Sequence, residues 1–291
     1  SDSRPDYAIC RILSRPTKSC FMRLPIVLPL LLSCLRNSSS LSTDGIGRER
    51  TKPIKRVAVI GAGIAGLTLA HALNNDPSLA CKDLEVTIFE SRKQLDVQAG
   101  SGVQLNGGMA VLGKINPQLQ QAAMNAAVPT GQLSGRNKSW WNNKSEDKLW
   151  DFDITAMFKK AGGTTAEELL MNDQAVWFAI MRGALQEVLA ENLPNDGSTQ
   201  LLFDKNLVKI ESSEGSAVCE FSDGTNYGPF DLIVGCDGIK SAVKEYIEKG
   251  KISQEASQRE GNAAALYSGI RVAYAVTDAS ESERTREPRV V

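Results

Sequence analysis

The clearest candidate for a functional motif is a set of three glycines with the spacing G-x-G-x-x-G: Gly61, Gly63 and Gly66. A β-branched run at 56–60 precedes them and an apolar run follows, so the pattern predicts a strand, a tight turn and a helix. Gly61 permits the turn, Gly63 leaves room for a pyrophosphate, and Gly66 lets the helix pack on the strand. The sequence therefore predicts a dinucleotide site at the helix N-terminus, against the alternative of a glycine-rich turn without a ligand.

An acid follows the next strand along the chain. Residues 85–90 form a second β-branched run that ends in Glu90, with Ser91 after it. An acid in this position binds ribose hydroxyls, although it usually lies about 20 residues after the first glycine and here it lies further. We assign the extra residues to a surface loop at 74–84.

Two later segments carry further polar groups at the ends of predicted strands. The run from Asp231 leads into Asp237-Gly238 and then into a helix that extends to about Lys249, so Asp237 lies where open α/β sheets bind ligands. Another strand, at 176–181, is followed by a helix that opens with Arg182, whose guanidinium could pair with a phosphate.

A glycine-rich passage at 100–106 also leads from a strand to a helix, and it contains Gly102, Val103 and Gln104. Short strand runs at 201–203, 207–211 and 217–221, separated by turn residues, predict a β-meander that covers the parallel sheet.

These segments together resemble the single-component FAD-dependent monooxygenases, a family of aromatic-ring hydroxylases, salicylate-hydroxylase-like enzymes and zeaxanthin epoxidases, over about residues 56–276. The resemblance implies an α/β fold: a Rossmann-like FAD-binding domain with a parallel sheet and a β-meander, plus the start of a substrate-domain sheet. It implies that NAD(P)H reduces bound FAD and that one oxygen atom of O2 then enters an apolar substrate. Epoxidation of a carotenoid is the first expectation, and aromatic hydroxylation is the second.

The resemblance also assigns roles to residues. It places Gly61, Gly63, Gly66 and Glu90 at the ADP part of FAD, residues 100–106 beside the flavin, Arg182 at the phosphate or ribityl part, and Asp237-Gly238 at the pyrophosphate and in NAD(P)H use. The cofactor-binding candidates are Gly61, Gly63, Ile64, Ala65, Gly66, Glu90, Ser91, Gly102, Val103, Gln104, Arg182, Asp237 and Gly238. No catalytic residue is assigned, because the cofactor carries the hard chemistry.

One departure from the family is that its second flavin motif, G-D-A-x-H with a following proline, is absent, since His71 is the single histidine. We therefore expect a chain truncated before that motif. Two alternatives remain open: an FAD-binding, non-catalytic subunit of a larger assembly, which could be membrane-associated, and a flavin- or NAD-dependent reductase.

Composition excludes several other classes of function. One histidine argues against most His-dependent triads and multi-histidine metal sites, and the six cysteines contain no C-x-x-C pair, so we expect no metal and mostly buried free thiols. The mixed charges at 249–260 predict a solvated loop and no nucleic-acid surface.

The chain divides by composition into four expected parts. Residues 1–54 read as a presequence, with a signal-like apolar run at 24–35 and a Ser- and Arg-rich stretch after it, and the residues before Met22 could be readthrough. A signal-like run followed by a transit-like stretch predicts that the protein is located in a plastid and enters it through the secretory pathway. The alternative is that the protein stays in the secretory pathway. We expect the FAD/NAD(P)-binding domain at 55–262, the start of an incomplete substrate domain at 263–277, and a disordered tail at 278–291.

Overall fold

The computed structural model describes residues 54–76, 84–96, 100–105, 107–138, 146–164, 167, 169–171, 173–213, 215–253 and 269–270. Their contacts form two compact units, one from the described parts of 1–94 and 193–269, the other from the described parts of 95–192 and 270–291. The predicted presequence, the predicted strand at the start of the substrate domain and the predicted tail lie almost wholly outside the described residues.

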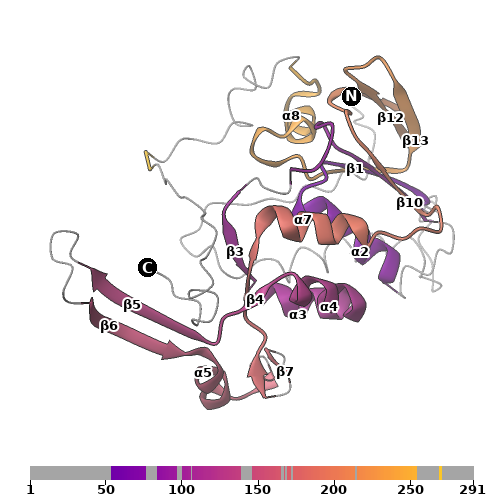
Figure 1. Ribbon diagram of the computed structural model, residues 1–291. Coiled ribbons are helices and arrows are strands. Elements are labelled where there is room, and N and C mark those ends of the chain that lie inside the picture. Colours follow the sequence, from indigo (N-terminus) through magenta and orange to yellow (C-terminus); the bar gives the residue numbers. More distant parts are fainter. Residues whose placement is uncertain are drawn as a thin grey trace, which may run out of the picture. The chain divides into compact units, whose positions relative to one another are not determined.

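In its described residues, the first unit contains a four-stranded parallel sheet, a three-stranded antiparallel sheet and the helices α2 and α8 (Figure 1). Its elements are β1 (Arg56–Ile60), α2 (Ile64–Asn75), β2 (Glu85–Phe89), β10 (Thr199–Leu202), β11 (Leu207–Ser213), β12 (Ser216–Phe221), β13 (Asn226–Phe230), β14 (Leu232–Gly235), the 3-10 turn η2 (Gly238–Lys240) and α8 (Ala242–Lys249). The parallel sheet has the order β10-β2-β1-β14 and the meander the order β11-β12-β13, so the predicted α/β class with a parallel sheet and a β-meander is confirmed.

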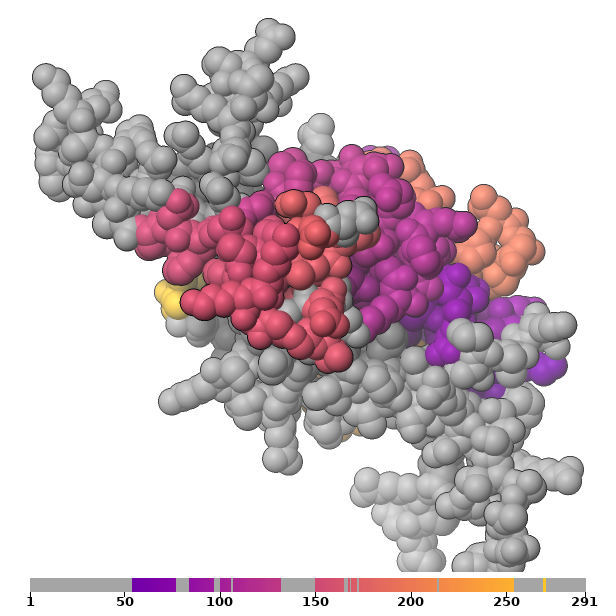
Figure 2. Space-filling model, turned by 90° about the horizontal axis from the view of Figure 1, so that it is seen from below, coloured from indigo at the N-terminus to yellow at the C-terminus, as the bar shows by residue number. Residues whose placement is uncertain are grey.

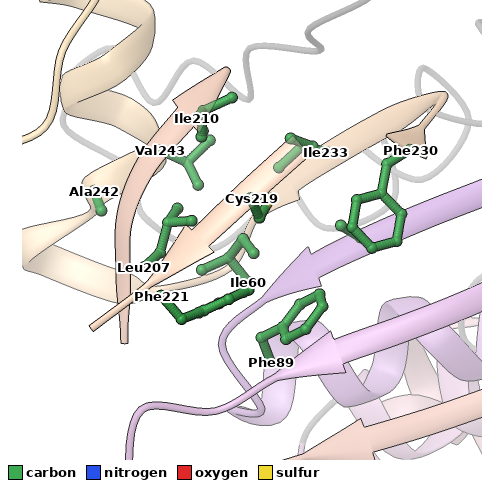
Figure 3. Close-up of a cluster of buried hydrophobic side chains, with 11 residues drawn as sticks. Ile60, Phe89, Leu207, Ile210, Cys219, Phe221, Phe230, Ile233, Ala242 and Val243 are labelled. Carbon is green, nitrogen blue, oxygen red and sulfur yellow. The ribbon is translucent and has the colours of Figure 1, made fainter. Parts of the chain in front are cut away.

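The parallel sheet is buried on both faces, as its apolar strands require. Alternate residues of β1 serve different faces: Ala58 and Ile60 belong to the core shared with the meander, whereas the side chain of Val59 lies against Gly66 of α2. Figure 3 shows the shared core, in which Phe89 at the end of β2 and Phe221 of β12 point toward each other, with ring centroids 4.5 Å apart. The meander is thereby fixed to the end of β2.

Two details of this unit differ from the sequence-based expectations. The run at 201–203 was expected in the meander, but it lies in β10, which pairs in parallel with β2, and β13 completes the meander instead. A short apolar run does not reveal its partner, because pairing is decided by distant residues. Asn74 was expected in a loop but belongs to α2, where its side chain bonds to the carbonyl of Ala70 and the hydroxyl of Thr199.

The second unit combines short antiparallel sheets with helices. Its elements are β3 (Gly102–Leu105), α3 (Gly108–Ile115), α4 (Pro117–Asn125), β4 (Val128–Pro129), β5 (Gln132–Lys138), β6 (Glu146–Asp153), α5 (Ile154–Ala161), β7 (Leu170–Met171), β8 (Gln174–Ala175), β9 (Phe178–Met181) and α7 (Arg182–Glu191). β9 pairs with β3 on one side and β4 on the other. In Figure 2 the magenta segment that contains α3 and α4 lies beside the pink segment from β6 to β9, so distant parts of the chain form one surface.

We expect Phe221→Ala to destabilise the first unit by about 3–5 kcal/mol, because it removes a ring that is 1% exposed and contacts both Phe89 and Tyr227. Urea unfolding followed by far-UV circular dichroism measures this loss. The matched control is Ile239→Ala, whose side chain is 73% exposed and which should change the free energy of unfolding by less than about 0.5 kcal/mol. Equal losses in the two variants would contradict the assigned core.

Candidate functional site

The turn between β1 and α2 depends on close contact between backbones. Gly61 has a positive φ of 105°, its N–H donates to the carbonyl of Phe89 at 2.8 Å, and a Cβ on it would lie 2.6 Å from the carbonyl oxygen of Cys236. A Cβ on Gly66 would lie 2.0 Å from the carbonyl oxygen of Gly61. Contacts within the chain therefore require glycine at both positions, as the motif predicts.

Gly63 is a glycine for a different reason. Its φ of −72° suits any residue, and a Cβ built on it would meet nothing within 4 Å. The helix α2 that it caps has no side-chain hydrogen bond at its N-cap and no acidic residue in its first turn, which contains Ile64 and Ala65. The N-cap residue thus supplies no side-chain hydrogen bond to the first N–H groups of α2, and the positive end of the helix dipole lies at the same place, an arrangement suited to binding phosphate.

Glu90 is held beside this turn. The residue is 9% exposed, and its Oε2 accepts a hydrogen bond from the backbone N–H of Ala62 at 3.0 Å. Its Oε1 accepts from the N–H of Arg92 at 3.0 Å and from the hydroxyl of Ser91 at 3.3 Å. An ionised carboxylate has about four acceptor positions, so three donors leave capacity for a ligand hydroxyl. Residue types alone do not predict the Ala62 contact, because it is made by a backbone N–H and not by a side chain.

Asp237 has a structural task as well as its predicted place at the strand end. Its Oδ2 accepts from the N–H groups of Ala242 at 2.6 Å and Val243 at 3.3 Å, and its Oδ1 accepts from the hydroxyl of Ser241 at 2.5 Å. The carboxylate therefore caps α8. Gly238, with a φ of 79° and no atom within 4 Å of a built Cβ, leaves backbone exposed beside it. The pyrophosphate contact of Asp237 and Gly238 stays a prediction.

These groups of the first unit meet at the carboxyl ends of β1, β2 and β14. The N–H of Cys236 donates to the carbonyl of Ile60 at 2.7 Å, just as that of Gly61 donates to Phe89. Open α/β sheets bind ligands at this edge. The structure thus brings the glycine turn, Glu90 and Asp237 together, and the open space beside Gly63 leaves room for the ADP part of a dinucleotide.

A second group of predicted residues lies in the second unit and is described by itself. Gly102, Val103 and Gln104 form β3, in which Gly102 is in register with Met181 of β9. Arg182 opens α7 as predicted, and its N–H donates to the carbonyl of Ser101 at 3.2 Å.

Gly100 holds the base of the Arg182 side chain. It has a φ of 99°, and a Cβ on it would lie 3.3 Å from the Cβ and Cδ of Arg182. Asn106 lies outside the described residues. The role of Arg182 at a phosphate or ribityl group stays a prediction.

Two thiols in the first unit are protected from ionisation. Burial raises the pKa of Cys219 to about 12, and burial together with the negative charge of Asp237 raises the pKa of Cys236 to about 12. Both cysteines are free. Within the described ranges there is no cluster of three or more His, Cys, Asp or Glu side chains arranged for a metal ion, and no helix long and apolar enough to cross a membrane.

Comparison with known proteins gives a consistent set of relatives. The family model described as NAD(P)-binding Rossmann-like domain matches residues 59–121. A salicylate hydroxylase from Pseudomonas putida is 31% identical over 203 residues, covering 69% of this chain and 39% of the relative. An FAD-dependent monooxygenase from Gibberella moniliformis is 28% identical over 207 residues, covering 69% of this chain and 42% of the relative.

A third relative is named for its aromatic substrate. The 3-amino-4-hydroxybenzoate 2-monooxygenase from Streptomyces cremeus is 29% identical over 193 residues, covering 66% of this chain and 42% of the relative. The chain thus spans about two fifths of the length of the curated relatives it matches.

We expect Cys236 to resist alkylation in the folded protein. With a pKa raised to about 12, its thiolate fraction at pH 8 is on the order of a thousandfold lower than that of an ordinary thiol near 8.5. The rate of Cys236 alkylation should rise about tenfold for each pH unit until the pH reaches this pKa. Iodoacetamide labelling mapped by mass spectrometry measures the alkylation rate, with the urea-denatured protein as the control. Labelling of native Cys236 as fast as in urea would contradict the assignment.

Proposed function

Because this chain belongs to the FAD-dependent monooxygenase family, we propose that its first unit binds the ADP part of FAD and that the protein serves the oxygenation of an aromatic substrate. The observation that carries the proposal is Gly63, which no contact within the described chain requires to be glycine, although it stands at the uncapped start of α2. A pyrophosphate at that point explains the residue.

The roles of the chain's own residues follow from their geometry. The N–H groups that open α2 would bind the pyrophosphate, and Glu90, fixed by Ala62 and Arg92, would accept hydrogen bonds from the adenosine ribose. Asp237 would orient the turn at Gly238 by capping α8. For Arg182 of the second unit, the role that the resemblance implies, pairing with a phosphate, stays a prediction. Bound FAD supplies the redox chemistry, with NAD(P)H as the proposed reductant and O2 as the oxygen source.

The substrate proposal follows the relatives' names. A salicylate hydroxylase and a 3-amino-4-hydroxybenzoate 2-monooxygenase support an aromatic ring as the substrate class. Carotenoid epoxidation, our first expectation from the sequence, stays an untested prediction. Membrane association, a presequence at residues 1–54 and a plastid location stay untested predictions as well. The other alternative from the sequence, a non-catalytic FAD-binding subunit of a larger assembly, also stays an untested prediction.

We expect Gly63→Val to weaken FAD binding by about 100-fold, or about 2.8 kcal/mol, while leaving stability nearly unchanged, because the new side chain enters space that only a ligand would fill. Gly66→Val should instead lower the free energy of unfolding by about 3 kcal/mol or more, since its Cβ overlaps the backbone of Gly61. Flavin fluorescence titration and urea unfolding measure the two effects.

The matched control for Gly63→Val is Gly131→Val, because Gly131 also has open space around a built Cβ and a φ outside the left-handed region. It should retain both FAD binding and stability. Unchanged FAD affinity in Gly63→Val would remove the proposed pyrophosphate site.

The proposed activity is tested by a visible absorption spectrum of the purified full chain, followed by NADPH or NADH without oxygen, and then by oxygen and salicylate. We expect the bands of oxidised flavin to bleach with one nicotinamide cofactor and a hydroxylated product to form on aeration. Bound flavin that neither cofactor reduces would support the non-catalytic subunit and overturn the monooxygenase proposal. A chain that binds no added FAD would overturn both.

A further inference from the structure

The segment between β10 and β11 lies directly beside the proposed ribose-binding acid. The N–H of Glu90 donates to the carbonyl of Leu202 at 2.8 Å, and the N–H of Lys205 donates to the carbonyl of Glu90 at 2.8 Å. The N–H of Asp204 donates to the carbonyl of Arg92 at 2.9 Å. The backbone of Glu90 is therefore bonded through both its N–H and its C=O, and the carbonyl two residues later is held as well.

This segment is itself in a conformation that needs support. Asp204 has a positive φ of 57°, in the left-handed region that residues other than glycine adopt at a cost. Such a conformation persists only where surrounding contacts determine it. Asp204 is held by the hydrogen bond from its own N–H to Arg92, and its neighbour Lys205 is anchored through its side chain.

The Lys205 ammonium group is anchored in the meander. It forms an ion pair with Asp223, donates to the hydroxyl of Thr225 at 3.0 Å and lies 5.2 Å from the ring centroid of Tyr227. The Lys205 side chain is only 12% exposed. The hydrogen bond from Lys205 lowers the pKa of Asp223 to about 2, and the same bond raises the pKa of Lys205, so both groups are charged at neutral pH.

The turn that contains Asp223 and Thr225 has hydrogen bonds of its own. The Oδ1 of Asp223 accepts hydrogen bonds from both the N–H and the hydroxyl of Thr225, at 3.1 and 2.6 Å. Tyr227 packs its ring 5.2 Å from that of Phe89, which directly precedes Glu90. The meander thus holds the chain on both sides of Glu90, through an aromatic contact before it and through Lys205 after it.

We propose that Lys205 is a positioning residue for Glu90: its ion pair with Asp223 fixes the 203–206 segment against the Glu90 backbone, and so aims the carboxylate at the adenosine ribose. This inference rests on the proposed function, since it assumes that Glu90 binds a ribose. It assigns to the meander, which the sequence suggested was only a cover for the sheet, a part in selecting the ligand. The matching surface pair, Lys209 with Glu211, has both side chains more than half exposed, and its hydrogen bond joins two residues of β11.

The test compares ADP with 2′-deoxy-ADP by isothermal titration calorimetry on the full chain freed of flavin. An acid at the ribose bonds to the 2′-hydroxyl, so the wild-type protein should prefer ADP by about tenfold. Lys205→Met keeps the length of the side chain but removes its charge, and should lower this ratio to about threefold. Glu90→Gln should lower it similarly, and the double variant should lose little more than either single one, because the two changes act on one interaction.

The ratio separates positioning from general stability, because partial unfolding weakens both ligands equally. Lys205→Arg, which keeps the charge, should restore most of the preference, and Lys209→Met should retain it in full. A Lys205→Met variant that still prefers ADP tenfold would overturn the positioning role, even if both affinities fall. Loss of the preference in Lys209→Met would do the same.

The proposed function can fail separately. If the wild-type protein binds FAD but shows no preference for ADP over 2′-deoxy-ADP, then Glu90 does not bind the ribose, and the inference is overturned while FAD binding stands. If the wild-type protein binds neither FAD nor ADP, the proposed function is overturned and the inference with it.

Discussion

The hydrogen bond between the Glu90 carboxylate and the backbone N–H of Ala62 joins the two parts of the candidate site, the end of β2 and the turn after β1. It forms only because Gly61 allows that turn to lie against the backbone at Cys236 and Gly66 allows α2 to start against it. Each of these approaches leaves no room for a Cβ. The site is therefore made from backbone contacts, and its side chains contribute by holding that backbone still.

The sequence predicted this part of the molecule well, because its signals are local. A strand, three glycines and a helix follow one another within twenty residues, and each glycine has a separate physical reason that the pattern implies. The helix that opens with Arg182 and the helix that ends at Lys249 were also predicted from adjoining residues. In each case the residues that predict the element belong to that element or directly adjoin it.

Contacts between distant residues could not be predicted in the same way. The run at 201–203 gave no indication that it would pair with β2, and Asp237 gave none that its carboxylate would cap α8. Lys205 and Asp223 were equally unremarkable as charged residues near turns. Their importance comes from the fold, which brings the meander to the end of β2. Patterns of residue type describe elements, whereas a site depends on which elements become neighbours.

The parallel sheet also has a consequence for how the protein forms during synthesis. Val86 of β2 pairs with Thr199 of β10, and Val57 of β1 pairs with Leu232 of β14, so the 95–192 part of the second unit is translated between neighbouring strands of one sheet. Pairing between such distant segments requires closing long loops and is slow. β1 and β2 thus leave the ribosome well before their outer partners, so their outer edges stay unpaired until β10 and β14 are synthesised, and unpaired strand edges of this kind are prone to aggregation.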